Sequence, residues 1–265
     1  MAVDDALLAS HVPGRSSPVL RLYGWKPAAV SLGRTQDAAR SHSRDFLRQE
    51  GIDLVRRPTG GLAVLHEHER TYSVVTGFDT PPFSRSLREN YRRISRALRR
   101  ALELLGIETS VPEDAPRTRP GSAARMSGPV CFERASAHEI IAEGHKLIGS
   151  AQLRRRDAFL QHGSIPCRCE AGRLAAALGQ RREPAGFVDL ERLLGNRPSF
   201  EELDTALVHG FEQQFGVRLE LARLSSEERE RAVRLYAWKY LSAAWTYGGR
   251  LGERELRWGP ASATK

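Results

Sequence analysis

Short strand-like runs, most of them followed by glycine or proline, fill residues 1–78 around one short helix, and this pattern limits the possible fold more than any other feature. One short helix is expected among them, from about residue 40 to Gly51, where glycine suits the left-handed end of a helix. The expected strands share alternating or β-branched residues and are 19–23, 29–32, 52–55, 63–66 and 71–75. Strands joined by turns, without regular helices between them, exclude a doubly wound βαβ sheet.

The rest of the chain supplies helices and a second group of strands. Ser86 and Glu89 form a capping box before an apolar stripe that ends at Gly106, and Ser199 and Ser225 begin two further helices. Strands are expected at 139–142, 146–152 and 158–165, with a hairpin turn at Glu143-Gly144. The pattern predicts an α+β fold of mixed, largely antiparallel sheets covered by helices. We expect one catalytic domain over 1–265, with a core at about 18–185 and a C-terminal helical part at about 186–250.

Composition excludes several classes of protein. No run approaches the roughly 18 consecutive apolar residues of a membrane helix, and the start of the chain lacks a signal-peptide pattern. Three cysteines in 265 residues make no disulfide framework, so a reducing cytoplasm is the expected location. The net charge of +9 favours an anionic partner, but no nucleic-acid motif is present, so nucleic acid is an unlikely partner.

Two polar segments in the N-terminal half are candidate binding elements. In Arg56-Arg57-Pro58-Thr59-Gly60-Gly61, two glycines allow backbone amides to approach a ligand, and the arginines can hold an anion; a tight turn with solvated arginines is the alternative. In His66-Glu67-His68-Glu69, the two histidines share a strand face, but no third metal ligand is nearby. A polar turn is favoured over a metal site, with one histidine available to line a pocket.

Thiols and one lysine are the candidate reactive groups. Cys131 lies at the end of a proline-rich segment, just before a strand, which is a common position for a nucleophile; an inert buried thiol is the alternative. Cys167 and Cys169 form a competing pair of unknown role. Lys146 is one of only four lysines in a chain with 41 basic residues, and in a half-buried pocket its amine could exchange a proton. A hairpin-end lysine in water is the other interpretation.

Taken in order, these segments resemble one known superfamily. The chain is similar to the biotin/lipoate protein ligases and lipoyltransferases, and most of all to the octanoyltransferases of lipoate assembly that use a cysteine and a lysine. The resemblance covers about residues 18 to 245. The motifs that carry it are Tyr23-Gly24-Trp25, Ser31-Leu32-Gly33, RRPTGG with AVLH at 56–66, TYSVV at 71–75, Cys131-Phe132, HEI at 138–140, KLIGSAQ at 146–152 and LQHGSI at 160–165.

The resemblance implies a fold, a reaction and a set of site residues. It implies a biotin/lipoate ligase-like domain that moves octanoyl from acyl carrier protein to a lipoyl-domain lysine, as in the glycine-cleavage H protein, without a metal or a cofactor. Cys131 would carry the acyl group as a thioester, and Lys146 would be the active-site lysine. The residues expected to border the substrate are Arg56, Arg57, Gly60, Gly61, His66, Gly149, Ser150, His162 and Gly163.

Three rival functions remain at this stage. An ATP-dependent lipoate ligase would share the lysine and the glycine loop but would not need Cys131. An amidotransferase that moves octanoyl from H protein to dehydrogenase acyltransferase subunits would use the same cysteine and lysine. An arginine-rich nucleic-acid binder is the non-enzymatic alternative. The octanoyltransferase function is chemically consistent, because a thiolate can accept an acyl group from a thioester and release it again.

Overall fold

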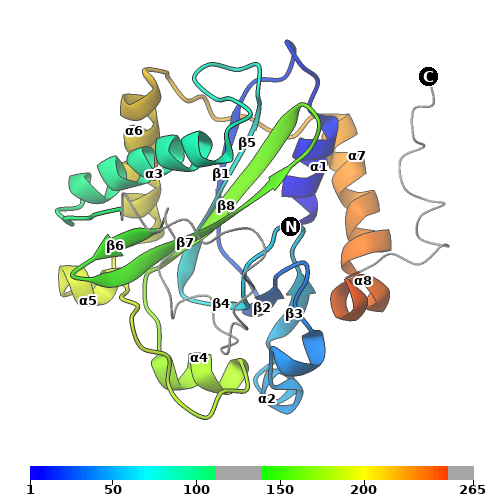
Figure 1. Cartoon of the computed structure of the whole chain (residues 1–265), viewed down its shortest axis with the longest axis vertical. Helices are drawn as coiled ribbons and strands as arrows, with labels where there is room; N and C mark the ends of the chain where they lie inside the picture. Colours follow the sequence, from blue (N-terminus) through cyan, green and yellow to red (C-terminus); the bar gives the residue numbers. More distant parts are fainter. Residues whose placement is uncertain (112–138, 250–265) are drawn as a thin grey trace.

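The chain forms two sheets with helices around them (Figure 1). The structure is a computed structural model and describes residues 1–111 and 139–249. Its larger sheet has five antiparallel strands in the order β1-β5-β8-β7-β6. Their bounds are β1 Val19–Tyr23, β5 Glu69–Gly77, β6 Ile140–Ala142, β7 His145–Arg154 and β8 Ala158–Pro166.

A smaller three-stranded sheet lies beside one face of the larger one (Figure 1). Its order is β3-β2-β4, from β2 Ala29–Leu32, β3 Asp53–Arg56 and β4 Val64–His66. Strands β2 and β3 are parallel because the chain crosses over between them through a 3-10 turn, η1 Ala38–Arg40, and α2 Arg44–Gln49. Strands β2 and β4 are antiparallel. The predicted mixed, largely antiparallel α+β fold is therefore confirmed.

Two long helices cover the other face of the large sheet. Helices α3 Leu87–Leu104 and α6 Phe200–Phe215 pack on each other and on the sheet, forming the main apolar core with side chains such as Tyr72, Ile148 and Phe159. The predicted capping contacts form at Ser86 and, as a full box, at Ser199. Successive side chains of a strand point to opposite faces, so the neighbours of these core residues face the small sheet instead.

The remaining helices pack on different parts of the two sheets. Helices α4 Ala171–Ala177 and α5 Leu190–Leu194 follow β8. Helix α1 Ala2–Ser10 packs against α7 Ser226–Leu235, which continues through a π-helical turn, η2 Tyr236–Tyr240, to α8 Ala243–Gly248. Among the described residues, none of the helices has the length and apolarity needed to span a bilayer.

The structure departs from the predicted elements mainly at the two ends of the chain. Helix α1 is not among the predicted elements, because Asp4 and Asp5 interrupt its apolar stripe, yet both are buried with polar partners. The helix expected from Ser225 onward is α-helical only to Leu235, where it changes to the π-helical turn η2. The hairpin turn between β6 and β7 is confirmed, with positive φ at both Glu143 and Gly144.

Candidate active site

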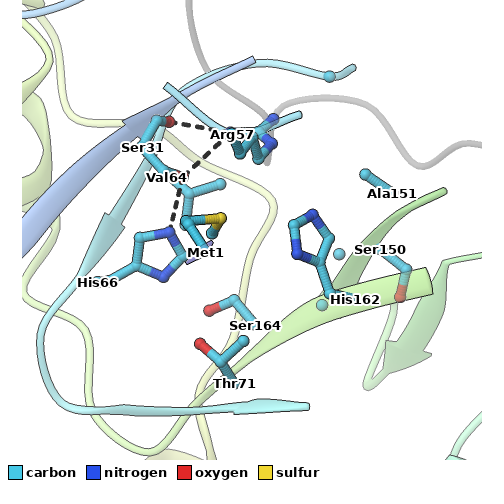
Figure 2. Close-up of a pocket in the computed structure, with 13 residues that line it drawn as sticks. Met1, Ser31, Arg57, Val64, His66, Thr71, Ser150, Ala151, His162 and Ser164 are labelled. Carbon is cyan, nitrogen blue, oxygen red and sulfur yellow. Dashed lines mark hydrogen bonds between the residues drawn. The ribbon is translucent and has the colours of Figure 1, made fainter. Parts of the chain in front are cut away.

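A pocket opens between the two sheets, on the face of the large sheet opposite α3 and α6. Its cavity volume is about 50 Å³. Figure 2 shows Ser31 and His66 approaching from the small sheet and Thr71, His162 and Ser164 from the large one. Of the residues expected to border the substrate, those that line this pocket are Arg57, Gly61, His66, Gly149, Ser150, His162 and Gly163.

Lys146 lies at the edge of this pocket and not in water. Its side chain is 1 % exposed, and its Nζ forms an ion pair with Glu139. Its backbone is fixed by hydrogen bonds to Gly186 and Val188. A Cβ on the pocket residue Gly149 would lie 3.1 Å from Lys146 Cε and 3.3 Å from Nζ, so the missing side chain leaves room for the ammonium group. The solvated hairpin-end interpretation of Lys146 is therefore wrong.

The loop after β3 is held by Arg57, whose guanidinium is buried. Its nitrogens donate to the carbonyls of Gly60, Leu62 and Ser31 and to Ser31 Oγ. The loop also passes directly over Gly33, where a Cβ would lie only 1.9 Å from the Gly61 carbonyl oxygen. The two segments can approach this closely only because position 33 has no side chain. The interpretation of this segment as a turn with solvated arginines is wrong for both arginines, since both are buried.

Arg56 points away from the pocket, so its expected place beside the substrate is not observed. Its guanidinium donates to six backbone carbonyls, from Gly33, Arg34, Gln36, Trp245, Thr246 and Tyr247. The last three belong to α8, so Arg56 supplies a cation and hydrogen-bond donors at the C-terminal end of that helix. Gly60 is also absent from the pocket lining. Arg56 therefore joins β3 to the C-terminal helices.

His162 presents a neutral ring to the pocket. Its Nε2 is 2.6 Å from Thr59 Oγ1, and its Nδ1 has no hydrogen-bond partner among residues 1–111 and 139–249. Burial lowers the pKa of His162 to about 3, with the nearby Arg57 cation acting in the same direction against Asp4. The ring is therefore uncharged in the folded protein near neutral pH.

That neutral state predicts a pH-dependent stability. Because the folded-state pKa of His162 is below its ordinary value, the unfolded chain binds more protons than the folded one between about pH 6.5 and 3. Stability is therefore lost as the pH falls through this window. Between pH 7 and pH 5 we expect the wild type to lose about 2 kcal/mol more unfolding free energy than His162→Gln. Urea unfolding at both pH values tests this, and equal losses would contradict the assignment.

Ser150 and Gly163 form the floor of the site through their backbone. Ser150 Oγ is 2.6 Å from the Tyr72 hydroxyl, on the core face of the sheet, so its side chain points away from the pocket. A Cβ on Gly163 would lie 2.5 Å from the Tyr72 ring and 2.6 Å from the Gly149 carbonyl oxygen, so only glycine fits there. Burial raises the pKa of Tyr72 to about 12.

His66 is held from both sides of its ring. Its Nε2 is 2.7 Å from Ser31 Oγ, its Nδ1 is 2.8 Å from Glu69 Oε1, and the ring stacks on Trp25 at a centroid distance of 4.2 Å. His68, which was expected to share a strand face with His66, lines a different pocket. Within the described part of the chain, no cluster of three or more candidate metal ligands occurs. Ser31, Thr59 and Glu69 are not among the residues expected to border the substrate, because their hydrogen-bond partners lie on other segments of the chain.

Two of the three cysteines lie in the described part of the chain, and both are poor nucleophiles. Cys131 lies outside the described residues. Cys167 is fully buried, and burial raises its pKa to about 11. Burial, followed by the Asp189 carboxylate, raises the pKa of Cys169 to about 12. Neither thiol is a ready thiolate near neutral pH, and reactivity requires the thiolate.

Comparison with known proteins identifies the family. The family model described as lipoyl protein ligase A/B catalytic domain matches residues 1–212. The octanoyltransferase LipM of Kyrpidia tusciae is 41 % identical, with 93 % of each chain covered. A lipoate-protein ligase A bound with ATP superimposes with a TM-score of 0.80 at 25 % identity, covering 94 % of this chain and 93 % of the other.

A second solved structure gives the same result with a different ligand. A putative lipoate protein ligase from T. acidophilum, with bound lipoic acid, has a TM-score of 0.77 at 25 % identity and covers 93 % of this chain and 92 % of that one. The matched range and the two-sheet arrangement agree with the family resemblance of the motifs. The chain therefore belongs to the lipoyl protein ligase A/B catalytic-domain family, and within it is an acyltransferase of the octanoyltransferase kind.

Proposed function

We propose that the protein transfers an octanoyl group from acyl carrier protein to the lysine of a lipoyl domain, such as that of the glycine-cleavage H protein. Cys131 carries the octanoyl group as a thioester between the two steps, and Lys146 serves as the acid and base. The observation that carries the proposal is the buried ammonium of Lys146 beside Gly149, at the edge of the pocket. The reaction uses no metal and no cofactor, and its expected location is the cytoplasm.

The reaction has two steps, and in each step the octanoyl group moves to a new nucleophile. The Cys131 sulfur attacks the carbonyl carbon of the donor thioester, a new C–S bond forms, and the carrier thiol leaves with a proton. The neutral lysine amine of the acceptor then attacks the Cys131 thioester, an amide forms, and the Cys131 thiol is restored with the proton lost by the amine. Covalent catalysis of this kind divides one difficult transfer into two easier ones.

The chemistry of Lys146 would assist both steps. A cation near a thiol lowers the thiol pKa and so raises the fraction of reactive thiolate. The same amine can pass a proton to a leaving thiol and later receive one from an attacking amine. Glu139 forms the ion pair that holds the ammonium beside Gly149. Arginine at this position would keep the charge but could not give up its proton.

The pocket wall suits an apolar acyl chain even though many of its residues are polar. Ser31 and His66 are bonded to each other, and Thr71 Oγ1 bonds to Glu69 and accepts from Trp25 Nε1. Polar groups satisfied within the wall present their carbon atoms to the cavity, where each buried methylene of the substrate gains about 0.8 kcal/mol. Val64 adds an apolar side chain to the same wall. Val74 and Ile148 lie in the main apolar core instead.

The edge of β7 supports a role for backbone amides in holding the tetrahedral oxyanion. Strand β6 begins at Ile140, opposite Ile148, so among the described residues β7 has a strand neighbour only on its β8 side from Gly149 onward. Gly149, Ser150 and Ala151 all line the pocket. Amides on an unpaired edge can donate to an oxyanion, and losing one such donor typically costs roughly 3–4 kcal/mol of transition-state stabilisation.

The direct test is the acyl-enzyme itself. Incubation with octanoyl acyl carrier protein, without ATP, is expected to add the mass of one octanoyl group, mapped to Cys131. The adduct is expected to be absent in Cys131→Ser and retained in Cys167→Ser and Cys169→Ser, whose wild-type thiol pKa values are raised. Intact-protein and peptide mass spectrometry measure it.

The outcomes separate the rival functions. A requirement for ATP and free lipoate would overturn the proposal in favour of the ligase function. An adduct that forms only with octanoylated H protein as donor would indicate the amidotransferase. Tight duplex binding with a steep salt dependence and no adduct would instead support the nucleic-acid binder.

A further inference from the structure

Ser31, His66 and Glu69 form a continuous hydrogen-bonded chain at one wall of the pocket. Ser31 Oγ is 2.7 Å from His66 Nε2, and His66 Nδ1 is 2.8 Å from Glu69 Oε1. All three side chains are buried, and both Ser31 and His66 line the pocket (Figure 2). A hydroxyl, an imidazole and a carboxylate within hydrogen-bond reach, in that order, are the signature of an activated nucleophile.

The donors around this chain fix the direction of each proton. Arg57 Nη1 lies 3.1 Å from Ser31 Oγ and can only donate, so the Ser31 proton is directed to His66 Nε2. The proton of the neutral His66 ring is then on Nδ1, where the Glu69 carboxylate accepts it. This is the tautomer in which imidazole can take a proton from serine.

The base is also held rigidly. Trp25 stacks on the His66 ring, and its Nε1 donates to Thr71 Oγ1 at 2.9 Å; Thr71 in turn donates to Glu69 Oε1. The three members come from β2, β4 and the start of β5, so elements of both sheets orient the chain. Preorganisation of this kind is what a reactive serine requires.

We propose that Ser31 is a second acyl-accepting nucleophile, with His66 as its base and Glu69 as the orienting carboxylate, and that it hydrolyses medium-chain acyl thioesters and activated esters. Ser31 Oγ attacks the carbonyl carbon, a C–O bond forms and the C–S bond breaks. The serine proton passes to His66 Nε2 and from there to the leaving thiol. Water then attacks the acyl-serine, His66 takes the proton of that water, and the fatty acid leaves as Ser31 regains its proton.

Arg57 favours the first step through its charge. Its guanidinium is buried beside Ser31 Oγ, where a cation stabilises the negative charge that develops as the oxygen loses its proton. The chain does not involve Cys131 or Lys146. The proposed hydrolytic activity therefore stands or fails independently of octanoyl transfer through Cys131.

An alkyl fluorophosphonate tests the nucleophile, because an activated serine displaces its fluoride and keeps the phosphonyl group. Peptide mass spectrometry is expected to place the adduct on Ser31 in the wild type and equally in Cys131→Ala. Ser31→Ala is expected to show no adduct. Ser73→Ala is the matched control, since Ser73 is a buried serine of β5 that donates to Asp4 and is not among the residues that line the pocket, and Ser31 is expected to be labelled in it at the wild-type rate.

The dependence on the base supplies the second measurement. His66→Gln and Glu69→Gln are expected to slow labelling of Ser31 by about 10²-fold to 10⁴-fold, the range for loss of a base or its orienting carboxylate. In the Cys131→Ala background, adding His66→Gln or Glu69→Gln is expected to slow hydrolysis of p-nitrophenyl octanoate by the same factor. No adduct on Ser31 in the wild type, or a rate in His66→Gln equal to the wild-type rate, would overturn the proposal. A Cys131 acyl adduct without Ser31 labelling would support octanoyl transfer and contradict only the proposed hydrolysis at Ser31.

Discussion

Replacing Lys146 by methionine is expected to lower kcat for octanoyl transfer by about 10²-fold to 10⁴-fold, the usual contribution of one acid–base group. The same change removes the cation from a buried carboxylate. Lys146 is paired with Glu139, and breaking a buried pair from one side costs about 3–5 kcal/mol. Activity and unfolding free energy are therefore expected to fall together, as measured by transfer rates and urea unfolding.

A double variant separates these two effects. Glu139→Gln in the Lys146→Met background removes the buried charge, so most of the lost unfolding free energy is expected to return. The catalytic amine is still absent, so kcat is expected to stay low. Recovery of both properties in the double variant would show that Lys146 acts only through stability, contrary to its proposed role.

Lys146→Arg tests proton transfer more narrowly. Arginine keeps a positive charge for Glu139 but is never deprotonated in a protein. The crowded space beside Gly149, where a Cβ would already lie 3.3 Å from Nζ, gives the larger guanidinium little room. We expect transfer to remain at least about tenfold below wild type, and full activity would remove the acid–base role.

The fold was largely predictable because its strands and turns are local signals. The strand at 158–165 is observed as β8 Ala158–Pro166, and the turn at Glu143-Gly144 is where predicted. Helix α1 was not predictable in the same way. Its Asp4 is buried because Arg21 and Tyr23 of β1 bond to it, and Asp5 because Lys239 of η2 does. Those partners are distant in sequence, and local periodicity carries no information about them.

Most of the residues expected to border the substrate line the pocket, but the direction of each side chain was not predictable from the sequence. The family resemblance selected Arg56 and Arg57 as a pair, yet alternation along the strand end sends only Arg57 to the pocket. It selected Ser150, whose hydroxyl bonds to Tyr72 on the other face. The Ser31–His66–Glu69 chain joins three strands, and only the pairing of those strands brings its members together.

The other large expected effect concerns Gly33, which the chain needs as glycine for a reason unrelated to its own φ. An alanine Cβ there would lie 1.9 Å from the Gly61 carbonyl oxygen and 2.9 Å from its carbon. Both atoms are backbone, so the loop itself must move. The Arg57 bonds to Gly60 and Leu62 hold that loop against Ser31, and they would be strained or lost.

We therefore expect Gly33→Ala to lower the unfolding free energy by about 3 kcal/mol, the upper part of the usual range for overpacking. Formation of the Cys131 adduct is expected to fall with it, since the displaced loop carries the pocket residues Arg57 and Gly61. Gly60→Ala is the matched control for stability, because no atom of residues 1–111 or 139–249 lies within 4 Å of its added Cβ. There the unfolding free energy is expected to stay equal or rise by about 0.4–1 kcal/mol, as the unfolded chain loses entropy. Equal unfolding midpoints for the two variants in urea would show that the loop yields freely, and that the close approach of Gly61 to Gly33 does not hold the pocket wall in place.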